Sequence, residues 1–254
     1  MQPVVEGTRV HTDSAGLLEG MVTIPSRQGE FPAYRAAPSE VEGVPVVLVV
    51  QEIFGVHEHI KDVARRLAKL GYFAVAPELY FRQGDVSHLP SIDAIRQVVA
   101  KVPDAQVLSD LDACADWAAQ QGADGKRLAV TGFCWGGRIT WLYAAHQPAL
   151  KAAVAWYGRL VGDHSPLQPE HPIDAVQKLR VPVLGLYGGA DSSIPLESVE
   201  RMRTALSNLG VDSEIEVYPD APHAFYADYR PSYRKAAADD AFERLKRWLR
   251  EHGV

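Results

Sequence analysis

Cysteine is scarce in this chain of 254 residues, and the two that occur, Cys114 and Cys134, form no disulfide framework. Basic residues are in deficit, since 26 Lys and Arg face 32 Asp and Glu for a net charge of -6. That balance argues against nucleic acid as a partner. No apolar run is long enough to span a membrane, so a membrane partner is not expected either. Neither metal-ligand spacing of His and Cys nor a phosphate-binding glycine loop occurs, so we expect no metal and no cofactor.

The beginning of the chain lacks the basic stretch and apolar core that are typical of a signal peptide. We therefore expect a cytoplasmic protein, because a reducing compartment keeps a reactive thiol free. No repeat, low-complexity tract or linker divides the sequence. With 47% hydrophobic residues, the length fits one large domain. We predict a polar, irregular N-terminal arm at residues 1–19 and a single catalytic α/β domain at residues 20–254.

Periodicity predicts strands that alternate with helices. Strands are predicted where β-branched and apolar residues run together or alternate with polar ones, at residues 20–24, 30–36, 44–50, 72–76, 127–131, 152–157, 181–187 and 213–218. Helices are predicted where apolar residues recur every three or four positions, at residues 60–70, 107–119, 196–209 and 236–252 and in the stretch that ends at 146. Residues 78–103 and 158–178 are predicted to be irregular connections. This alternation predicts a mostly parallel central sheet with helices on both faces, a three-layer sandwich.

The segment TGFCWGG at residues 131–137 has the spacing Gly-x-Cys-x-Gly between a predicted strand and a predicted helix. That context is typical of a nucleophile elbow, a sharp turn in which glycines allow strand and helix to approach closely. Cys134 would lie at a helix N-terminus, where unpaired N–H groups and the helix dipole favour the reactive thiolate. The alternative is a buried cysteine that serves only for packing, which is the role we expect for Cys114 in mid-helix.

Two further polar residues also follow predicted strands. Asp191 comes after the strand at 181–187 and His223 after the strand at 213–218. The carboxyl ends of parallel strands meet at one edge of a sheet, and the chain order nucleophile, acid, histidine is that of α/β-hydrolases. His223 would take the thiol proton and return one to the leaving oxygen, while Asp191 would hold the histidine tautomer. Asp220 is a rival acid that lies too close to His223 in sequence.

Glu52 lies in the loop QEIFG, residues 51–55, after the buried strand at 44–50. Desolvation there, and a neighbouring thiolate, should raise the pKa of this carboxyl group, so that it could accept the thiol proton. The alternative is an ordinary exposed loop residue. The oxyanion hole of this fold uses the N–H after the nucleophile and one from the first loop, which selects the backbone of Trp135 and Ile53. His57 and His59 are weaker candidates for the site.

Taken together, these features resemble the dienelactone hydrolase (carboxymethylenebutenolidase) family. The matching positions extend from about residue 30 to the C-terminus and include residues 51–55, 76–82 and 132–137, Asp191 and His223. The resemblance implies an α/β-hydrolase fold. It also implies a carboxylic ester hydrolase that opens a small lactone or ester through an acyl-thiol intermediate. Cys134 would be the nucleophile, Asp191 and His223 would complete the triad, and Glu52 would activate the thiol.

The resemblance further implies that Arg82 holds a substrate carboxylate, which suits a bidentate guanidinium. The family's second arginine, four residues after the histidine, is replaced by Ala227, and Arg230 lies a little further on. We expect a small ester or lactone, anionic or neutral, as the partner and a monomer or weak homodimer. The alternative function is a redox-responsive or ligand-binding module that uses Cys134 as a reversibly oxidised thiol. The acid and histidine at strand ends favour hydrolysis, because a redox thiol needs neither.

Overall fold

The computed structural model describes residues 6–254, and all of its named strands belong to one sheet of eight strands. In space the strands lie in the order β1-β2-β4-β3-β5-β6-β7-β8. Their bounds along the chain are β1 (Leu17–Ser26), β2 (Gly29–Pro38), β3 (Pro45–Val50), β4 (Phe73–Pro77), β5 (Asp124–Phe133), β6 (Ala152–Trp156), β7 (Val183–Gly188) and β8 (Ser213–Tyr218). β2 pairs antiparallel with β1 on one side and β4 on the other, and every other pair of named strands is parallel.

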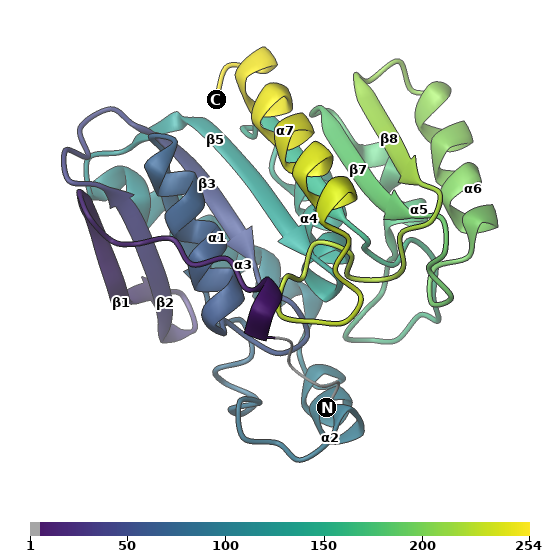
Figure 1. Cartoon of the computed structure of the whole chain (residues 1–254), viewed down its shortest axis with the longest axis horizontal. Coiled ribbons are helices and arrows are strands. Elements are labelled where there is room, and N and C mark those ends of the chain that lie inside the picture. Colours follow the sequence, from purple (N-terminus) through teal and green to yellow (C-terminus); the bar gives the residue numbers. More distant parts are fainter. Residues whose placement is uncertain (1–5) are drawn as a thin grey trace.

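Helices cover both faces of this sheet, with α1 and α7 in front and α3 and α4 behind (Figure 1). Their bounds are α1 (Glu58–Lys69), α2 (Ile92–Val99), α3 (Asp104–Gln120), α4 (Trp135–His146), α5 (Pro172–Ala175), α6 (Leu196–Ser207) and α7 (Lys235–Glu251), with single 3-10 turns η1 (Glu6–Thr8) and η2 (Val176–Lys178). The three-layer sandwich with a mostly parallel sheet, which the periodicity predicts, is therefore confirmed. No helix in residues 6–254 is both long and apolar enough to cross a bilayer.

The central strands show why the continuous apolar runs were informative. Every residue of β4 and β6 is buried, and so is all of β3 after Pro45. A strand with helices on both faces has no side on which a polar residue reaches water, so its sequence cannot alternate. The hairpin of β1 and β2 lies outside this parallel core, and β1 keeps the alternation of an edge strand.

Three segments differ from the predictions: the start of β1, the helix α2, and the short helix α5, which lies within the predicted connection 158–178. β1 begins at Leu17, so the strand includes the last three residues of the predicted arm, whose first five residues lie outside the described part of the chain. The helix α2 forms within the predicted connection 78–103, where the Ser91 hydroxyl caps it by accepting from the Ala94 N–H at 3.2 Å. This helix has eight residues and buries only Ile95 and Val99. Such a short apolar pattern is too weak to separate from a loop.

The N-terminal arm is attached to the body by polar contacts. The Thr12 N–H donates to Asp62 at 2.6 Å, and the Arg65 Nε donates to the Thr12 carbonyl at 2.8 Å. Further back, the Val10 N–H donates to Asp228 at 3.4 Å. The arm therefore connects α1 with the loop that follows β8.

Close backbone packing at the start of α4 yields a first prediction. A Cβ at Gly136 would meet the carbonyl oxygens of Val50 and Gln51, which are backbone atoms that cannot move aside cheaply. We expect Gly136→Ala to lower the free energy of unfolding by about 1–3 kcal/mol, measured by chemical denaturation. Gly7→Ala is the control, because a Cβ there meets nothing within 4 Å. Equal losses in the two variants would contradict the packing argument.

Candidate active site

Cys134 occupies the turn between β5 and α4 in a conformation that few residues adopt. Its backbone has φ 56° and ψ -112°, and its N–H donates to the Trp156 carbonyl at 3.0 Å. Non-glycine residues rarely hold a positive φ, so the surrounding packing must impose it. Gly132 allows this close approach, since a Cβ there would meet the Gly136 carbonyl. The segment therefore has the geometry of the predicted elbow.

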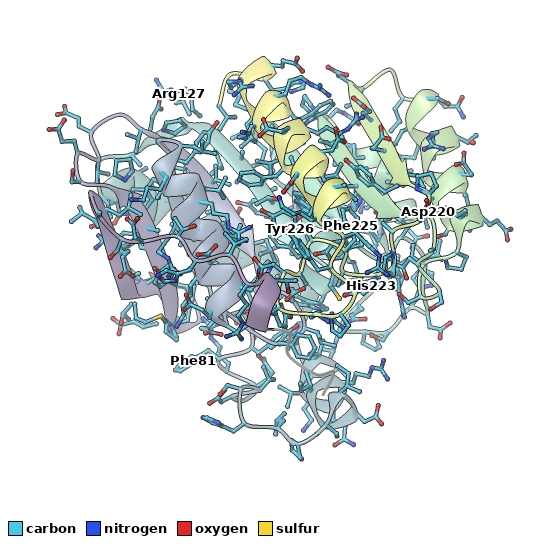
Figure 2. The ribbon with its side chains drawn as sticks, viewed as in Figure 1. Phe81, Arg127, Asp220, His223, Phe225 and Tyr226 are labelled. Atoms are coloured by element: carbon cyan, nitrogen blue, oxygen red, sulfur yellow. The ribbon has the colours of Figure 1, made fainter. Side chains whose placement is uncertain are left out.

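His223 and Asp191 reach the same turn from the ends of β8 and β7. The His223 Nε2 lies 3.2 Å from the Cys134 Sγ, and its Nδ1 lies 2.7 Å from the Asp191 Oδ2. Figure 2 shows His223 at the end of the molecule toward which β5 runs, while Arg127 marks the opposite end. Asp220 is exposed, and Asp191 takes the Nδ1 position that this rival acid would need. The structure brings Cys134, His223 and Asp191 together.

Asp191 is held by the chain that follows it. Its Oδ1 accepts from the Ser193 N–H at 2.8 Å, the Ser193 hydroxyl at 2.6 Å and the Ile194 N–H at 3.2 Å, which leaves Oδ2 to His223. Burial alone would raise the pKa of Asp191, but the hydrogen bonds from His223 and Ser193 lower it. Ser193 was not identified from the sequence. The available signal was the Asp-x-Ser spacing, in which an aspartate accepts from the backbone two residues on.

The environment of His223 favours the protonated form of its imidazole. Burial alone would lower the pKa of its imidazole, but the hydrogen bonds and negative charges of Asp191 and Cys134 raise it to about 10. An imidazole in contact with the sulfur is the partner that a cysteine nucleophile needs for proton transfer. Cys114, by contrast, is fully buried in α3, and burial raises the pKa of its thiol. Its predicted packing role agrees with this position.

Glu52 is buried, with 1% of its surface exposed, and its Oε2 has two donors. The His57 Nε2 lies 2.9 Å away and the Tyr229 hydroxyl 2.7 Å away. Burial alone would raise the pKa of Glu52, but the hydrogen bond and charge of His57, helped by His59 and Tyr229, lower it to about 2. The predicted rise of this pKa is therefore wrong, because the sequence did not reveal these donors.

A pocket of about 940 Å³ contains Cys134 and His223. Ile53 and Trp135, the two expected oxyanion-hole residues, line it as well. Four arginines line this pocket, and none of its described lining residues is Asp or Glu; they are Arg96, Arg138, Arg159 and Arg230. Within residues 6–254, no group of three His, Cys, Asp or Glu side chains is arranged to hold a metal ion.

Arg82 lies outside this pocket. Its guanidinium forms a two-pronged ion pair with Asp110, at 2.7 Å and 3.2 Å, and donates to the Ser26 hydroxyl at 3.0 Å. It also lies over the Phe31 ring, 5.4 Å from the centroid. The expected role of Arg82 in holding a substrate carboxylate is not supported, because a carboxylate of this chain already occupies the guanidinium.

A nucleophile elbow after a central parallel strand, with an acid and a histidine at the next strand ends, defines an α/β-hydrolase. The chain belongs to the dienelactone hydrolase family, whose sequence profile matches residues 31–253. It is accordingly a hydrolase of the ester and lactone type.

Three relatives illustrate this membership. The chain is 61% identical over 256 residues to a Methylorubrum extorquens protein provisionally named carboxymethylenebutenolidase, with 100% of this chain and 88% of that protein covered. A Salmonella typhimurium protein of the same provisional name is 58% identical over 248 residues, covering 97% of this chain and 92% of the relative. The crystal structure of a provisionally named dienelactone hydrolase from Klebsiella pneumoniae has a TM-score of 0.90 at 56% identity, covering 92% of this chain and 98% of that one. These findings confirm the predicted family.

The coupling of sulfur and imidazole yields a second prediction. We expect the pKa of His223, about 10 in the wild type, to fall in Cys134→Ser, because a neutral hydroxyl removes the negative charge beside the ring. An NMR titration of the His223 ring measures the midpoint. Cys114→Ala is the control, since that thiol is buried in α3 away from the pocket. An unchanged midpoint in Cys134→Ser would argue against the coupling.

Proposed function

We propose that the enzyme hydrolyses a small ester or lactone of the dienelactone kind through an acyl-thiol intermediate on Cys134. The observation that supports this most strongly is the continuous relay from sulfur to imidazole to carboxylate, with its two distances of 3.2 Å and 2.7 Å. A nucleophile, a base and an orienting acid within hydrogen-bond reach are what covalent catalysis of acyl transfer requires. We further propose that the enzyme acts in the cytoplasm as a monomer or weak homodimer.

In the acylation step, His223 takes the proton of the Cys134 thiol, and the sulfur attacks the carbonyl carbon of the substrate. The carbonyl oxygen becomes an oxyanion, which the N–H groups of Ile53 and Trp135 stabilise. Loss of one such donor typically costs about 2.7–4 kcal/mol of barrier. The carbon–oxygen bond to the leaving group then breaks, and His223 donates its proton to the leaving oxygen. In a lactone this oxygen stays attached to the acyl chain.

Deacylation repeats the same chemistry with water as the nucleophile. His223 takes a proton from water, the resulting oxygen attacks the thioester carbon, and the carbon–sulfur bond breaks to release a carboxylic acid and restore the thiol. Asp191 keeps the imidazole oriented in both steps and stabilises its charged form. His223 is a far better proton acceptor than Glu52, because their pKa values are about 10 and about 2.

The positive charge of the pocket points to an anionic substrate, and we propose that Arg159 and Arg230 bind its negative charge. Arg159 follows β6, is exposed and has no ion pair within residues 6–254. Arg230 is half-buried, with its guanidinium 5.6 Å from the centroid of the Phe54 ring. Arg138 is already neutralised, because both of its Nη atoms bind Asp104, at 2.8 Å and 2.7 Å. Arginine side chains that line a cleft attract anions into it.

The nucleophile assignment yields a third prediction. We expect Cys134→Ala to lose at least about a thousand-fold in kcat for an activated ester while its circular dichroism stays that of the wild type. Iodoacetamide should label Cys134 much faster than Cys114 in the wild type, as peptide mass spectrometry would measure. Cys114→Ala is the control and should keep its activity. Full esterase activity in Cys134→Ala would reject the acyl-thiol route.

The arginine assignment yields a fourth prediction. Arg159→Gln and Arg230→Gln should each raise KM about ten-fold for a substrate with a carboxylate and leave KM for a neutral ester of similar shape nearly unchanged. Steady-state kinetics with cis- and trans-dienelactone beside neutral short-chain esters would measure this. Arg82→Gln is the control and should change KM for neither class. Equal effects on charged and neutral esters would contradict carboxylate recognition by Arg159 and Arg230.

A further inference from the structure

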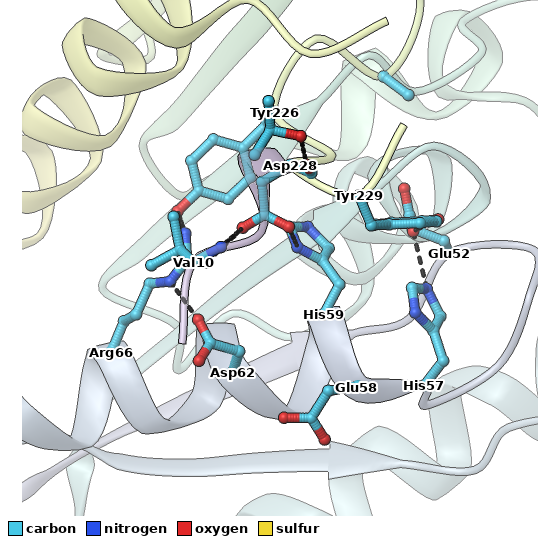
Figure 3. Close-up of polar contacts among 12 residues, drawn as sticks. Val10, Glu52, His57, Glu58, His59, Asp62, Arg66, Tyr226, Asp228 and Tyr229 are labelled. Carbon is cyan, nitrogen blue, oxygen red and sulfur yellow. Dashed lines mark hydrogen bonds and ion pairs between the residues drawn. The ribbon is translucent and has the colours of Figure 1, made fainter. Parts of the chain in front are cut away.

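Glu52, His57 and Tyr229 form a cluster that we call the carboxylate clamp. Its members come from three parts of the chain: the end of β3, the N-cap of α1 and the loop after β8. Both donors, His57 at 2.9 Å and Tyr229 at 2.7 Å, meet at the same oxygen, Oε2 (Figure 3). The other oxygen, Oε1, is buried without a partner among the described residues. The clamp therefore acts through Oε2 alone, and the loss of either donor leaves it one hydrogen bond.

The clamp joins two loops that both serve the reaction proposed above. The first loop, residues 51–57, we call the oxyanion loop, because it contains Ile53, whose N–H is one of the proposed donors to the oxyanion. Ile53 directly follows Glu52. It is folded back on itself, since the Gly55 N–H donates to the Glu52 carbonyl at 3.2 Å. The second, residues 219–234, we call the histidine loop, because it carries both His223 and Tyr229. The Oε2 atom of Glu52 thus connects the oxyanion loop, which contains Ile53, with the histidine loop, which contains His223.

A second connection lies beside the first. His59 on α1 pairs with Asp228, the neighbour of Tyr229, at 3.1 Å, and Asp228 also pairs with Arg66 at 2.6 Å (Figure 3). The histidine loop is therefore attached to α1 independently of the clamp. Removing a clamp donor should shift the oxyanion loop without releasing the histidine loop.

The surroundings of Glu52 favour its charged form. The centroid of the His57 ring lies 6.1 Å from that of the His59 ring and 4.9 Å from that of the Tyr229 ring. The ionisable side chains around the clamp are His59 on α1, Cys134 on the elbow, Tyr157 after β6, Asp228 and Arg230 on the histidine loop, and Glu78 after β4, which accepts from the Val56 N–H. A carboxylate that already accepts two hydrogen bonds at one oxygen is a weak proton acceptor.

From this geometry we propose that His57 and Tyr229 are positioning residues that hold Glu52, and through it the Ile53 N–H, in place for the oxyanion. Glu52 then acts on the loop and not on the thiol proton. An oxyanion donor is effective only within about 2.7–3.1 Å of the developing charge, so a small displacement of residues 51–57 reduces the rate. This inference rests on the proposed acyl-thiol chemistry.

Two reactions of the same thiol test the proposal, and they constitute our fifth prediction. Acylation by an activated ester needs both the thiolate and the oxyanion hole, whereas alkylation by iodoacetamide needs the thiolate but forms no oxyanion. In Tyr229→Phe, His57→Leu and Glu52→Gln, we expect kcat for the ester to fall about ten-fold or more with little change in KM. The alkylation rate of Cys134, and the pH at which it is half-maximal, should stay within about two-fold and a few tenths of a pH unit of the wild type.

Tyr143→Phe is the matched control. It also removes a tyrosine hydroxyl that donates to a carboxylate, Asp112, at 3.1 Å, but neither residue lines the catalytic pocket. Both rates should stay at their wild-type values in this variant. Thermal melts show which variants are folded, and Tyr229→Phe, which loses a single oxygen atom, keeps the test decisive if Glu52→Gln does not fold.

Two results would overturn the proposal. A parallel fall of ester hydrolysis and alkylation in Glu52→Gln would show that Glu52 acts on the thiol. Unchanged ester hydrolysis in both Tyr229→Phe and His57→Leu would show that the clamp positions nothing. Failure of the acyl-thiol chemistry itself is a separate result, because it would appear as full ester hydrolysis in Cys134→Ala, a variant with an intact clamp.

Discussion

The contact between the Cys134 sulfur and the His223 imidazole joins two segments that are 89 residues apart, and the rest of the site depends on it. Sulfur reaches the imidazole only because the elbow holds Cys134 at a positive φ. That conformation in turn requires glycines on both sides of the turn, where a Cβ would meet the neighbouring backbone. The same contact helps to raise the pKa of His223, so both the position and the charge of the imidazole depend on this turn.

The two carboxylates of the site show how burial and hydrogen bonding compete. Asp191 and Glu52 are both buried, which by itself favours the neutral acid. Each nevertheless has a lowered pKa, because each accepts hydrogen bonds from groups that stabilise its charge. Asp191 contacts His223 directly, whereas Glu52 lies between the oxyanion loop and the histidine loop. Carboxylates in one active site can therefore have different tasks without different protonation states.

Family membership predicts the positions and contacts of some residues better than those of others. The elbow cysteine, acid and histidine lie together because strand ends impose their positions. Arg82 has the expected residue type at the expected position, yet its guanidinium is bound to Asp110. Positive charge in the pocket comes instead from residues such as Arg159 and Arg230, which follow other strands. A long flexible side chain goes to its strongest partner, and the identity of that partner is a tertiary property.

Local sequence determined the order of strands and helices, the elbow, and the chain order of Cys134, Asp191 and His223, because periodicity and glycine spacing act over a few residues. It did not determine the short helix α2, whose apolar pattern is too brief, or the role of Ser193. Only the tertiary structure decided that His57 and Tyr229 donate to Glu52, since these partners lie five and 177 residues away and no local pattern encodes their meeting. The charge of Glu52 and the position of Arg82 follow from such distant contacts, and therefore the sequence by itself left both open.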